Sequence, residues 1–461
     1  MIEEADVVIV GSGIAGAAVH RSLQGAGLRI LVLEAGPALS AGNTHLRNLL
    51  PYDDGSWRGL VSAMARPPVR AGGQPVEDTP PAGPSAAVRS DQRAEEGLPG
   101  YGNCCGIGGN GLIWSGIVLP PTSTAGSGVS HEALEEAAAW LGAGIVADSP
   151  RQAWLQEAHG LTPVPLAWSA EEGWHGPRQL AGAGFHPRAV HSVRRIVHER
   201  GRALGVEARP GGAADDSFIA ARHIVIAAGV VGTTRLLWAS GLGRDLPGLG
   251  QGIVNHPVAV AQVAVPQPVW SRLANHPQLS RPAAARVLPA PAGGHTLVLA
   301  EPAWMMENRV DARATLSVYA YATLDRHASR RLSFVPEQLG PDGLSLPRFE
   351  FPPSEEERAC EERALGEARA WAAKLGRVLP SGRPRVLPRG ADQHLSGGAS
   401  IGPPDDPLSV AEPSGKIRSL ENVWVAGAAV LPEAVSTHPA QTIVALAART
   451  GRAVTALLIK D

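Results

Sequence analysis

The hydrophobic pattern at the start of the chain predicts two strands with a helix between them. Val7–Val10 is a β-branched run bounded by glycine; it is too short for a helix and is typical of a strand buried in a parallel sheet. Ile14–Gln24 follows with apolar residues at helical spacing, and Ile30–Leu33 repeats the strand pattern just before Glu34. This order of elements predicts an α/β fold in which parallel strands are covered by helices.

Later segments continue the alternation of strands and helices. Ile224–Ala228 is an apolar run that leads through Gly229 into a helical stretch, and Ser419–Leu458 contains a strand, a glycine, a loop and a long helix. We expect both strands to join the N-terminal sheet, with their glycines at the carboxyl ends where ligands bind in such folds. Ser130–Gly142 and Ser354–Gly376 are predicted helices, each with a serine at the N-cap.

The pattern changes to strands between Val258 and Glu350. Val258–Val265 and Thr315–Leu324 alternate in polarity or size, which predicts an antiparallel sheet with one face covered. Tyr319 and Tyr321 share one face of the second segment. We expect this face to pack in the core, with a place in a substrate pocket as the alternative.

Composition narrows the class of protein. The 461 residues carry a net charge of −2 with the signs mixed, so we expect no nucleic-acid surface and no polybasic membrane patch. No apolar run reaches the roughly 18 residues that span a bilayer, and the N-terminus lacks the basic region of a signal peptide. A cytoplasmic protein with many short elements is therefore expected, in keeping with 54 glycines and 40 prolines.

The cysteines and one long segment leave alternatives open. Cys104, Cys105 and Cys360 fit neither a disulfide framework nor a metal-ligand spacing, and we expect no metal. The adjacent pair is interpreted as part of a tight glycine-rich turn, with a redox switch as the alternative. Residues 66–100 contain seven prolines and almost no apolar periodicity, which predicts an irregular loop; it is either a surface excursion or a lid over the active site.

The N-terminal glycines predict a nucleotide site. Gly11, Gly13 and Gly16 form the pattern G-x-G-x-x-G between the first strand and helix. In such a site the first glycine makes a tight turn, the second lets a pyrophosphate approach the backbone, and the third lets helix and strand pack closely. Glu34 ends the second strand, where a carboxylate can bind both hydroxyls of a ribose. Because segments from the start, middle and end all converge on this site, a flavin is favoured over an exchanging nicotinamide.

In combination, four motifs resemble the glucose–methanol–choline (GMC) oxidoreductase family of flavoproteins. They are the N-terminal glycine motif with Glu34, "GIGGNGLIWSG" at Gly106–Gly116, "AAGVVGTTRLLWASGLG" at Ala227–Gly243, and the C-terminal "NVWVAGAAVLP…STHPAQTIVALA". Weaker similarities lie at His191–Glu207 and at Gly250–Val258. The motifs extend along the chain in the order in which they occur in the family.

The resemblance implies an FAD site. The residues it assigns to the cofactor are Gly11, Gly13, Ile14, Ala15, Gly16, Glu34, Ala35, Gly108, Gly109, Asn110, Val193, Ala228, Gly229, Thr233, Gly427, Ala428, His438, Pro439, Ala440, Gln441 and Thr442. Some relatives attach the flavin through a histidine at the position of Ile113, and an isoleucine cannot form that bond, so non-covalent FAD is expected. Trp114 is similar to a bacterial branch that contains sugar-acid dehydrogenases and pyranose oxidases.

Two histidines are implied as the catalytic pair. "HLSGG" resembles the family motif H-x-x-G-T, with His394 as its histidine and Gly398 in place of the threonine. His438 matches the second position, which is histidine or asparagine in relatives. An imidazole can accept the proton of an alcohol near neutral pH and return it. We expect His394 to be the base and His438 to hold the hydroxyl oxygen, although coupled histidines can share these roles.

The sequence thus predicts an α/β flavoprotein with a Rossmann-like FAD-binding lobe and a substrate lobe built on an antiparallel sheet backed by helices. Residues 1–257 and 390–461 are assigned to the FAD-binding lobe, and 258–389 to the substrate lobe. The expected reaction is oxidation of an alcohol, either a sugar or a hydroxylated natural product, with oxygen or another acceptor such as a quinone. The alternatives are a lyase in which the flavin does no redox work and a binding protein with a relic cofactor site.

Overall fold

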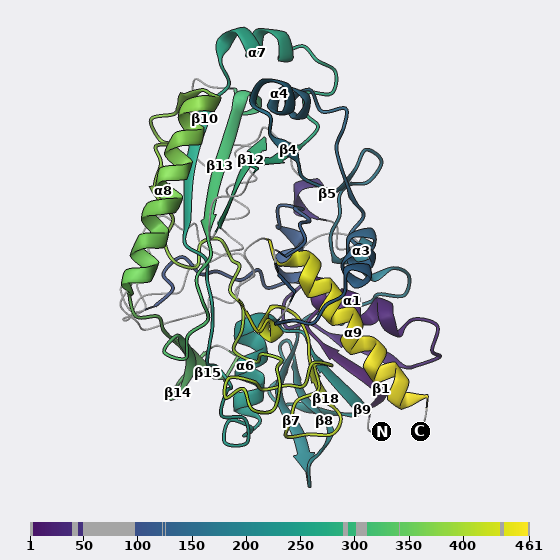
Figure 1. The fold of residues 1–461 in the computed structure, drawn as a ribbon. Helices are drawn as coiled ribbons and strands as arrows, with labels where there is room; N and C mark the ends of the chain where they lie inside the picture. The colour runs from purple at the N-terminus through teal and green to yellow at the C-terminus, as the bar shows by residue number, and fades with distance from the viewer. Residues whose placement is uncertain are drawn as a thin grey trace.

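The computed structural model describes residues 3–38, 45–48, 97–121, 123–124, 126–288, 294–300, 311–340, 342–433 and 438–459. Residues 66–96 of the predicted loop lie outside these ranges. Two large sheets dominate the described part, one near each end of the molecule (Figure 1). No helix among the described residues is both long and apolar enough to cross a membrane.

The first sheet is the predicted parallel sheet with an antiparallel extension. Its strands follow the order β2-β1-β9-β8-β7, and β18 also pairs with β9. Contacts among β1, β2, β9 and β18 are parallel, whereas β7 and β8 pair antiparallel with their neighbours in sequence. The bounds are β1 Glu3–Val10, β2 Ile30–Leu33, β7 His191–Glu199, β8 Arg202–Pro210, β9 Ser217–Ile226 and β18 Val423–Val425.

Helices cover this sheet as the apolar pattern requires. Helix α1 (Ile14–Leu23) packs beside the C-terminal helix α9 (Ala440–Leu458) (Figure 1), and their alanines and valines share one core with the strands. Helix α3 (His131–Trp140) also contacts α9, and its N-cap Ser130 accepts a hydrogen bond from the Ala133 backbone N–H, as the sequence predicts. The first and last thirds of the chain are therefore parts of a single packing unit.

The second sheet is antiparallel, as predicted. Its order is β16-β10-β13-β12-β11-β4, and β17 also pairs with β10. Helix α8 (Glu355–Leu375) lies along one face (Figure 1), where the alanines of both elements allow close packing. The bounds are β4 Thr162–Pro163, β10 Val258–Ala264, β11 Ala283–Arg286, β12 Gly294–Ala300, β13 Thr315–Ala322, β16 Arg377–Val378 and β17 Arg385–Val386.

Two details of the architecture differ from the simple segment boundaries. Strand β4 joins the second sheet although it lies at 162–163, inside the segment assigned to the FAD-binding lobe. The hairpin of β14 (Arg331–Leu339) and β15 (Ser345–Glu350) is separate from the second sheet and shares a core with α6 (Gly229–Ala239). The sequence pattern predicts strands between Val258 and Glu350, a range that includes β14 and β15 but not β4, and it does not say which sheet a strand joins.

The remaining elements are short. They are α4 Pro150–His159, α5 Pro177–Ala181, α7 Gln267–Leu273, β3 Ala143–Gly144, β5 Leu166–Ser169 and β6 Gly173–Trp174, with 3₁₀ turns η2 Leu46–Asn48, η3 Gly109–Leu112, η4 Ala312–Ala314 and η5 Ala428–Val430.

Candidate active site

A cavity of about 1130 Å³ extends from the carboxyl ends of the parallel strands to the antiparallel sheet. This volume exceeds the roughly 300–1,000 Å³ of most small-molecule sites, so the cavity has room for a dinucleotide and a substrate together. The glycine loops line one part of it, and residues of β10 and β13 line another.

The first glycine loop has the geometry that the motif predicts. Gly11 has φ of +102°, and a Cβ there would lie 2.5 Å from the Ala227 carbonyl oxygen. A Cβ on Gly16 would lie 2.0 Å from the carbonyl oxygen of Gly11. Gly13, the N-cap of α1, lines the cavity and has only the Gly108 oxygen near its Cβ position, at 3.7 Å. The backbone of the helix N-terminus is thus open to an anionic group.

Glu34 is held in place by three protein donors. Its carboxylate accepts hydrogen bonds from the Ser12 N–H (3.1 Å), the Ser12 hydroxyl (2.7 Å) and the Gly36 N–H (2.9 Å). The Ser12 hydroxyl oxygen in turn accepts from the Gly108 N–H at 2.9 Å. Burial raises the pKa of Glu34, while these hydrogen bonds act in the opposite direction. Ser12, a variable position of the motif, therefore links the two glycine loops to the carboxylate, a role that the sequence does not indicate.

Most residues assigned to the cofactor lie on the cavity wall. Those on the wall are Gly11, Gly13, Ile14, Ala15, Glu34, Ala35, Gly109, Asn110, Val193, Ala228, Gly229, Gly427, Ala428, His438, Pro439 and Ala440. The others, which do not line it, are Gly16, Gly108, Thr233, Gln441 and Thr442. Gly16 and Gly108 shape the loops from behind, and the Gln441 side chain is turned toward α3, where it donates to the Leu134 carbonyl at 2.8 Å.

His394 and His438 lie against each other in the same cavity. Their ring centroids are 4.7 Å apart and the rings meet edge to face, at 71°. Burial lowers the pKa of His394 to about 4 and also lowers that of His438, whose neighbouring imidazoles act in the same direction. Both rings are therefore neutral at physiological pH, so each has one bare nitrogen that can accept a proton.

Three further groups surround this pair. The His256 ring lies 5.7 Å from that of His394, and the Tyr321 ring stacks on His394 at 5.8 Å and on His295 at 4.5 Å. Tyr319 and Tyr321 line the cavity. Tyr321 also belongs to a core cluster and Tyr319 packs against it, so this face both packs in the core, as expected, and borders the cavity. The opposite face, which holds Val318, packs under α8.

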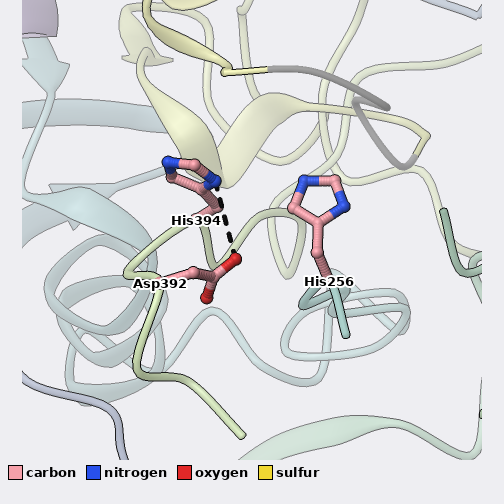
Figure 2. Close-up of side chains that lie close together, drawn as sticks. All are labelled: His256, Asp392 and His394. Carbon is pink, nitrogen blue, oxygen red and sulfur yellow. Dashed lines mark ion pairs between the residues drawn. The ribbon is translucent and has the colours of Figure 1, made fainter. Parts of the chain in front are cut away.

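Asp392 completes the cluster. Figure 2 shows its carboxylate directed at His394, with His256 beside them; Asp392 Oδ2 lies 3.5 Å from His394 Nδ1. One ligand-type atom from each of these three residues lies within 4.8 Å of the other two, an arrangement that could accept a cation. The sequence contains no metal-ligand spacing here, since His256 lies more than a hundred residues before the other two.

Part of the cavity wall suits a polar, ring-shaped molecule. Tyr319, Tyr321 and Trp114 supply aromatic surface, and Gln262 and Arg385 supply polar groups. Gln262 Nε2 donates to the Ser317 hydroxyl at 3.1 Å, whereas its Oε1 is buried with no hydrogen-bond partner among the described residues. Such an orphaned acceptor in a cavity wall is satisfied when a ligand donates to it.

These features fit FAD. The glycine loop leaves open space beside Gly13, the N-terminus of α1 opens toward the cavity, and Glu34 is anchored at the end of β2. The cavity then continues from this nucleotide-binding end to the histidines, in line with the length of a dinucleotide that carries its reactive ring at one end.

Comparisons with known proteins give the same assignment. Two family models, each described as GMC oxidoreductase, match residues 130–258 and 338–447, together just over half of the chain. C-glycoside 3-oxidase of Microbacterium trichothecenolyticum is 27% identical over 501 residues, covering 97% of this chain and 96% of its own. Pyranose 2-oxidase of Tricholoma matsutake is 24% identical and covers 68% of this chain and 63% of its own.

Solved structures share the fold. Pyridoxine 4-oxidase from Mesorbium loti superimposes with a TM-score of 0.68 over 97% of this chain and 98% of its own, at 16% identity. A variant of Aspergillus oryzae formate oxidase gives a TM-score of 0.72, with 99% coverage of both chains and 13% identity. From its family matches and its fold, this chain belongs to the GMC oxidoreductase family and is an FAD-dependent enzyme that acts on CH–OH groups.

Proposed function

We propose that this enzyme oxidises a secondary hydroxyl of a sugar ring, free or in a glycoside, with His394 as general base and His438 as the group that holds the hydroxyl oxygen. The observation that supports this proposal best is the contact of two neutral imidazoles, 4.7 Å apart, in the cavity that the glycine loops also line.

The cofactor would be held by the backbone around Gly13 and Gly109, by Glu34, and by the N-terminus of α9 beside Ala440. Bound FAD supplies the acceptor for the hydride that leaves the alcohol carbon. We propose that the cofactor is not covalently attached, because Ile113, which lines the cavity at the position where some relatives have a linking histidine, offers no nucleophile.

The histidines supply the proton chemistry. As the C–H bond breaks, the hydroxyl proton passes to His394, which is neutral because burial lowers its pKa to about 4. A positioned base of this kind contributes roughly 10²–10⁴-fold to the rate. His438 hydrogen-bonds the same oxygen and keeps the C–H bond directed toward the acceptor, so its contribution is chiefly one of orientation.

The substrate class rests on the cavity wall and the relatives. C-glycoside 3-oxidase, whose name specifies oxidation of a glycoside, matches this chain along nearly its whole length. The unpaired Gln262 oxygen and the aromatic surface of Tyr319 and Trp114 suit the hydroxyls and the apolar face of a pyranose. A small primary alcohol would leave the Gln262 acceptor unsatisfied.

Anaerobic mixing of the enzyme with a panel of alcohols tests the substrate proposal. The panel contains C-glycosides, free pyranoses, linear polyols and small primary alcohols, and the measured quantity is the rate at which flavin absorbance is lost. We expect reduction by pyranose rings, and Gln262→Leu should weaken apparent binding of the sugar more than it slows reduction. Fast reduction by small primary alcohols alone would refute the sugar assignment, and turnover without flavin bleaching would indicate a lyase. Reoxidation by air compared with a quinone then identifies the electron acceptor.

A further inference from the structure

We propose that Asp392 is a positioning residue that fixes the tautomer of His394, so that Nδ1 carries the hydrogen and Nε2 is the bare nitrogen that accepts the substrate proton. This inference rests on the proposed role of His394 as the base. None of the sequence motifs identifies Asp392, which lies two residues before the histidine.

The carboxylate of Asp392 is rigidly anchored. Its side chain is 3% exposed, and its Oδ1 accepts a hydrogen bond of 2.6 Å from Asn255 Nδ2. Burial raises the pKa of Asp392, whereas the hydrogen bonds that Asn255 and the His394 backbone N–H donate to the carboxylate act in the opposite direction. Gln393, between the two residues, has φ of +59°, a left-handed conformation that non-glycine residues adopt rarely and that is found disproportionately at active sites. The backbone is thus bent to hold acid and base side by side.

Asn255 in turn has a fixed orientation. Its Oδ1 accepts a hydrogen bond of 2.8 Å from the Gly390 N–H, so its amide nitrogen must be the atom that faces Asp392. The Oδ1 atom of Asp392 is therefore committed to Asn255, and only Oδ2 is directed at His394, whose Nδ1 lies 3.5 Å away. At this distance neither atom has a hydrogen-bond partner among the described residues; catalytic contacts are often long before substrate binds and shorten in the complex.

His256 cannot be the donor to Oδ2 in its neutral form. The Ala322 carbonyl accepts a hydrogen bond from the His256 ring, and Nδ1 of that ring has no hydrogen-bond partner among the described residues. The ring hydrogen is therefore on Nε2 and Nδ1 is bare. Because burial lowers the pKa of His256 to about 4, this ring stays neutral, which leaves His394 Nδ1–H as the donor to Asp392.

The same contact assists the proton transfer. When Nε2 takes the substrate proton, His394 becomes a cation in a buried site, where an uncompensated charge is costly. The rings of His256, His438 and Tyr321, which pack around His394, bring no negative charge at neutral pH, whereas the carboxylate of Asp392 faces the opposite edge of the imidazole. Asp392 thus orients the base before the reaction and stabilises its charged form during it.

The test compares the rates of flavin reduction in two variants of Asp392. If the residue were merely structural, Asp392→Ala, which removes more of the side chain, would be the slower variant, whereas our proposal predicts that Asp392→Asn is slower. In Asp392→Asn, the Asn255 amide still requires an oxygen opposite it, so the new NH₂ group faces His394 Nδ1 and forces the hydrogen onto Nε2. This tautomer cannot accept the substrate proton. Asp392→Ala removes the constraint and leaves both tautomers accessible. We expect flavin reduction to slow by roughly 10²–10⁴-fold in Asp392→Asn, as for loss of the base, but by only about 10–100-fold in Asp392→Ala.

Two further variants sharpen this test. Adding Asn255→Ala to Asp392→Asn lets the new amide rotate, so the double variant should reduce its flavin faster than Asp392→Asn alone. Asp405→Asn, an exposed aspartate outside the cavity, is the matched control and should behave as wild type. FAD content and melting temperature are measured for each variant. If Asp392→Asn does not retain FAD, the test rests on Asp392→Ala, and flavin reduction at the wild-type rate in that variant overturns the proposal.

The outcomes separate the two proposals. Near-normal reduction in His394→Ala would reject His394 as the base and with it this inference. Slow reduction in His394→Ala, together with near-normal reduction in Asp392→Asn or a slower Asp392→Ala, would reject only the role of Asp392. Loss of activity in a chelator, restored by a divalent cation, would also overturn the proposal, because His256, Asp392 and His394 would then form a metal site.

Discussion

Glu34→Ala should release FAD from an otherwise folded enzyme. The carboxylate accepts three hydrogen bonds from Ser12 and Gly36 and lies on the cavity wall, so about one of its four acceptor sites is left for the cofactor. Hydrogen bonds to a charged group are worth about 1.5–3 kcal/mol each. Loss of one such bond to the ribose would weaken FAD binding by about 1.5–3 kcal/mol, or roughly 10–10²-fold.

The protein itself should also lose stability. Removal of the carboxylate leaves the Ser12 and Gly36 N–H groups buried without a partner, at about 1–3 kcal/mol each; water that enters the space left by the side chain brings this toward the lower end. Glu34→Gln keeps the shape but turns an NH₂ group toward these donors, so it should also bind FAD poorly.

Flavin content after desalting and titration of the apoprotein with FAD measure this effect. Glu4→Ala is the matched control, because the Glu4 carboxylate lies on β1, the strand that leads into the glycine loop, and is 67% exposed. Once saturated with FAD, Glu34→Ala should be reduced by substrate at the normal rate, since the ribose is far from the reacting atoms. The ribose assignment would be refuted if Glu34→Ala retained its full FAD content. It would also be refuted if the variant, once saturated with FAD, were no longer reduced by substrate.

The same geometry leads to further predictions. His394→Ala should retain FAD but slow flavin reduction by roughly 10²–10⁴-fold, and His438→Asn should be milder because an amide still hydrogen-bonds the substrate oxygen; stopped-flow reduction measures both. Since burial lowers the pKa of His394 to about 4, the reduction rate should be flat between about pH 6 and 8 and fall only in acid. The unfolded chain, in which this ring has a pKa near 6.5, binds more protons between these two values, so the melting temperature should decrease as pH falls through that interval. Gly16→Ala should prevent stable folding or FAD binding, because its Cβ would lie 2.0 Å from the Gly11 oxygen. Acid precipitation should leave the flavin in solution; flavin that stays with the chain would reveal a covalent bond.

The N-terminal nucleotide site could be predicted from the sequence because its determinants are local. The strand, the glycine turn and the helix occupy consecutive residues, and neighbouring backbone oxygens leave no room for a side chain at Gly11 or Gly16. The strand bounds Ile30–Leu33 agree with the structure for the same reason. His394 and His438 could be named only through resemblance, because no periodicity places two residues 44 positions apart against one cavity.

The environment of the base could not be predicted in this way. Asn255 and Asp392 are 137 residues apart in the chain. Their contact depends on how the segment just before β10 packs against the segment that holds Asp392. The signal that was present, an acid two residues before His394, has no meaning without the positive φ of Gln393. For β13, alternation separates two faces correctly, but it cannot say that the Tyr321 face borders a cavity, because both faces are covered.

The position of β18 in the first sheet constrains the order of assembly. This strand, Val423–Val425, pairs with β9 beside the cofactor cavity, and α9 then packs on α1, the first helix of the chain. A ribosome must therefore release almost the whole chain before the N-terminal nucleotide fold acquires its last strand and its covering helix. We therefore expect FAD to be captured late, and a chain terminated before residue 423 to expose the apolar face of α1 and to be a substrate for chaperones and proteases rather than a partly active enzyme.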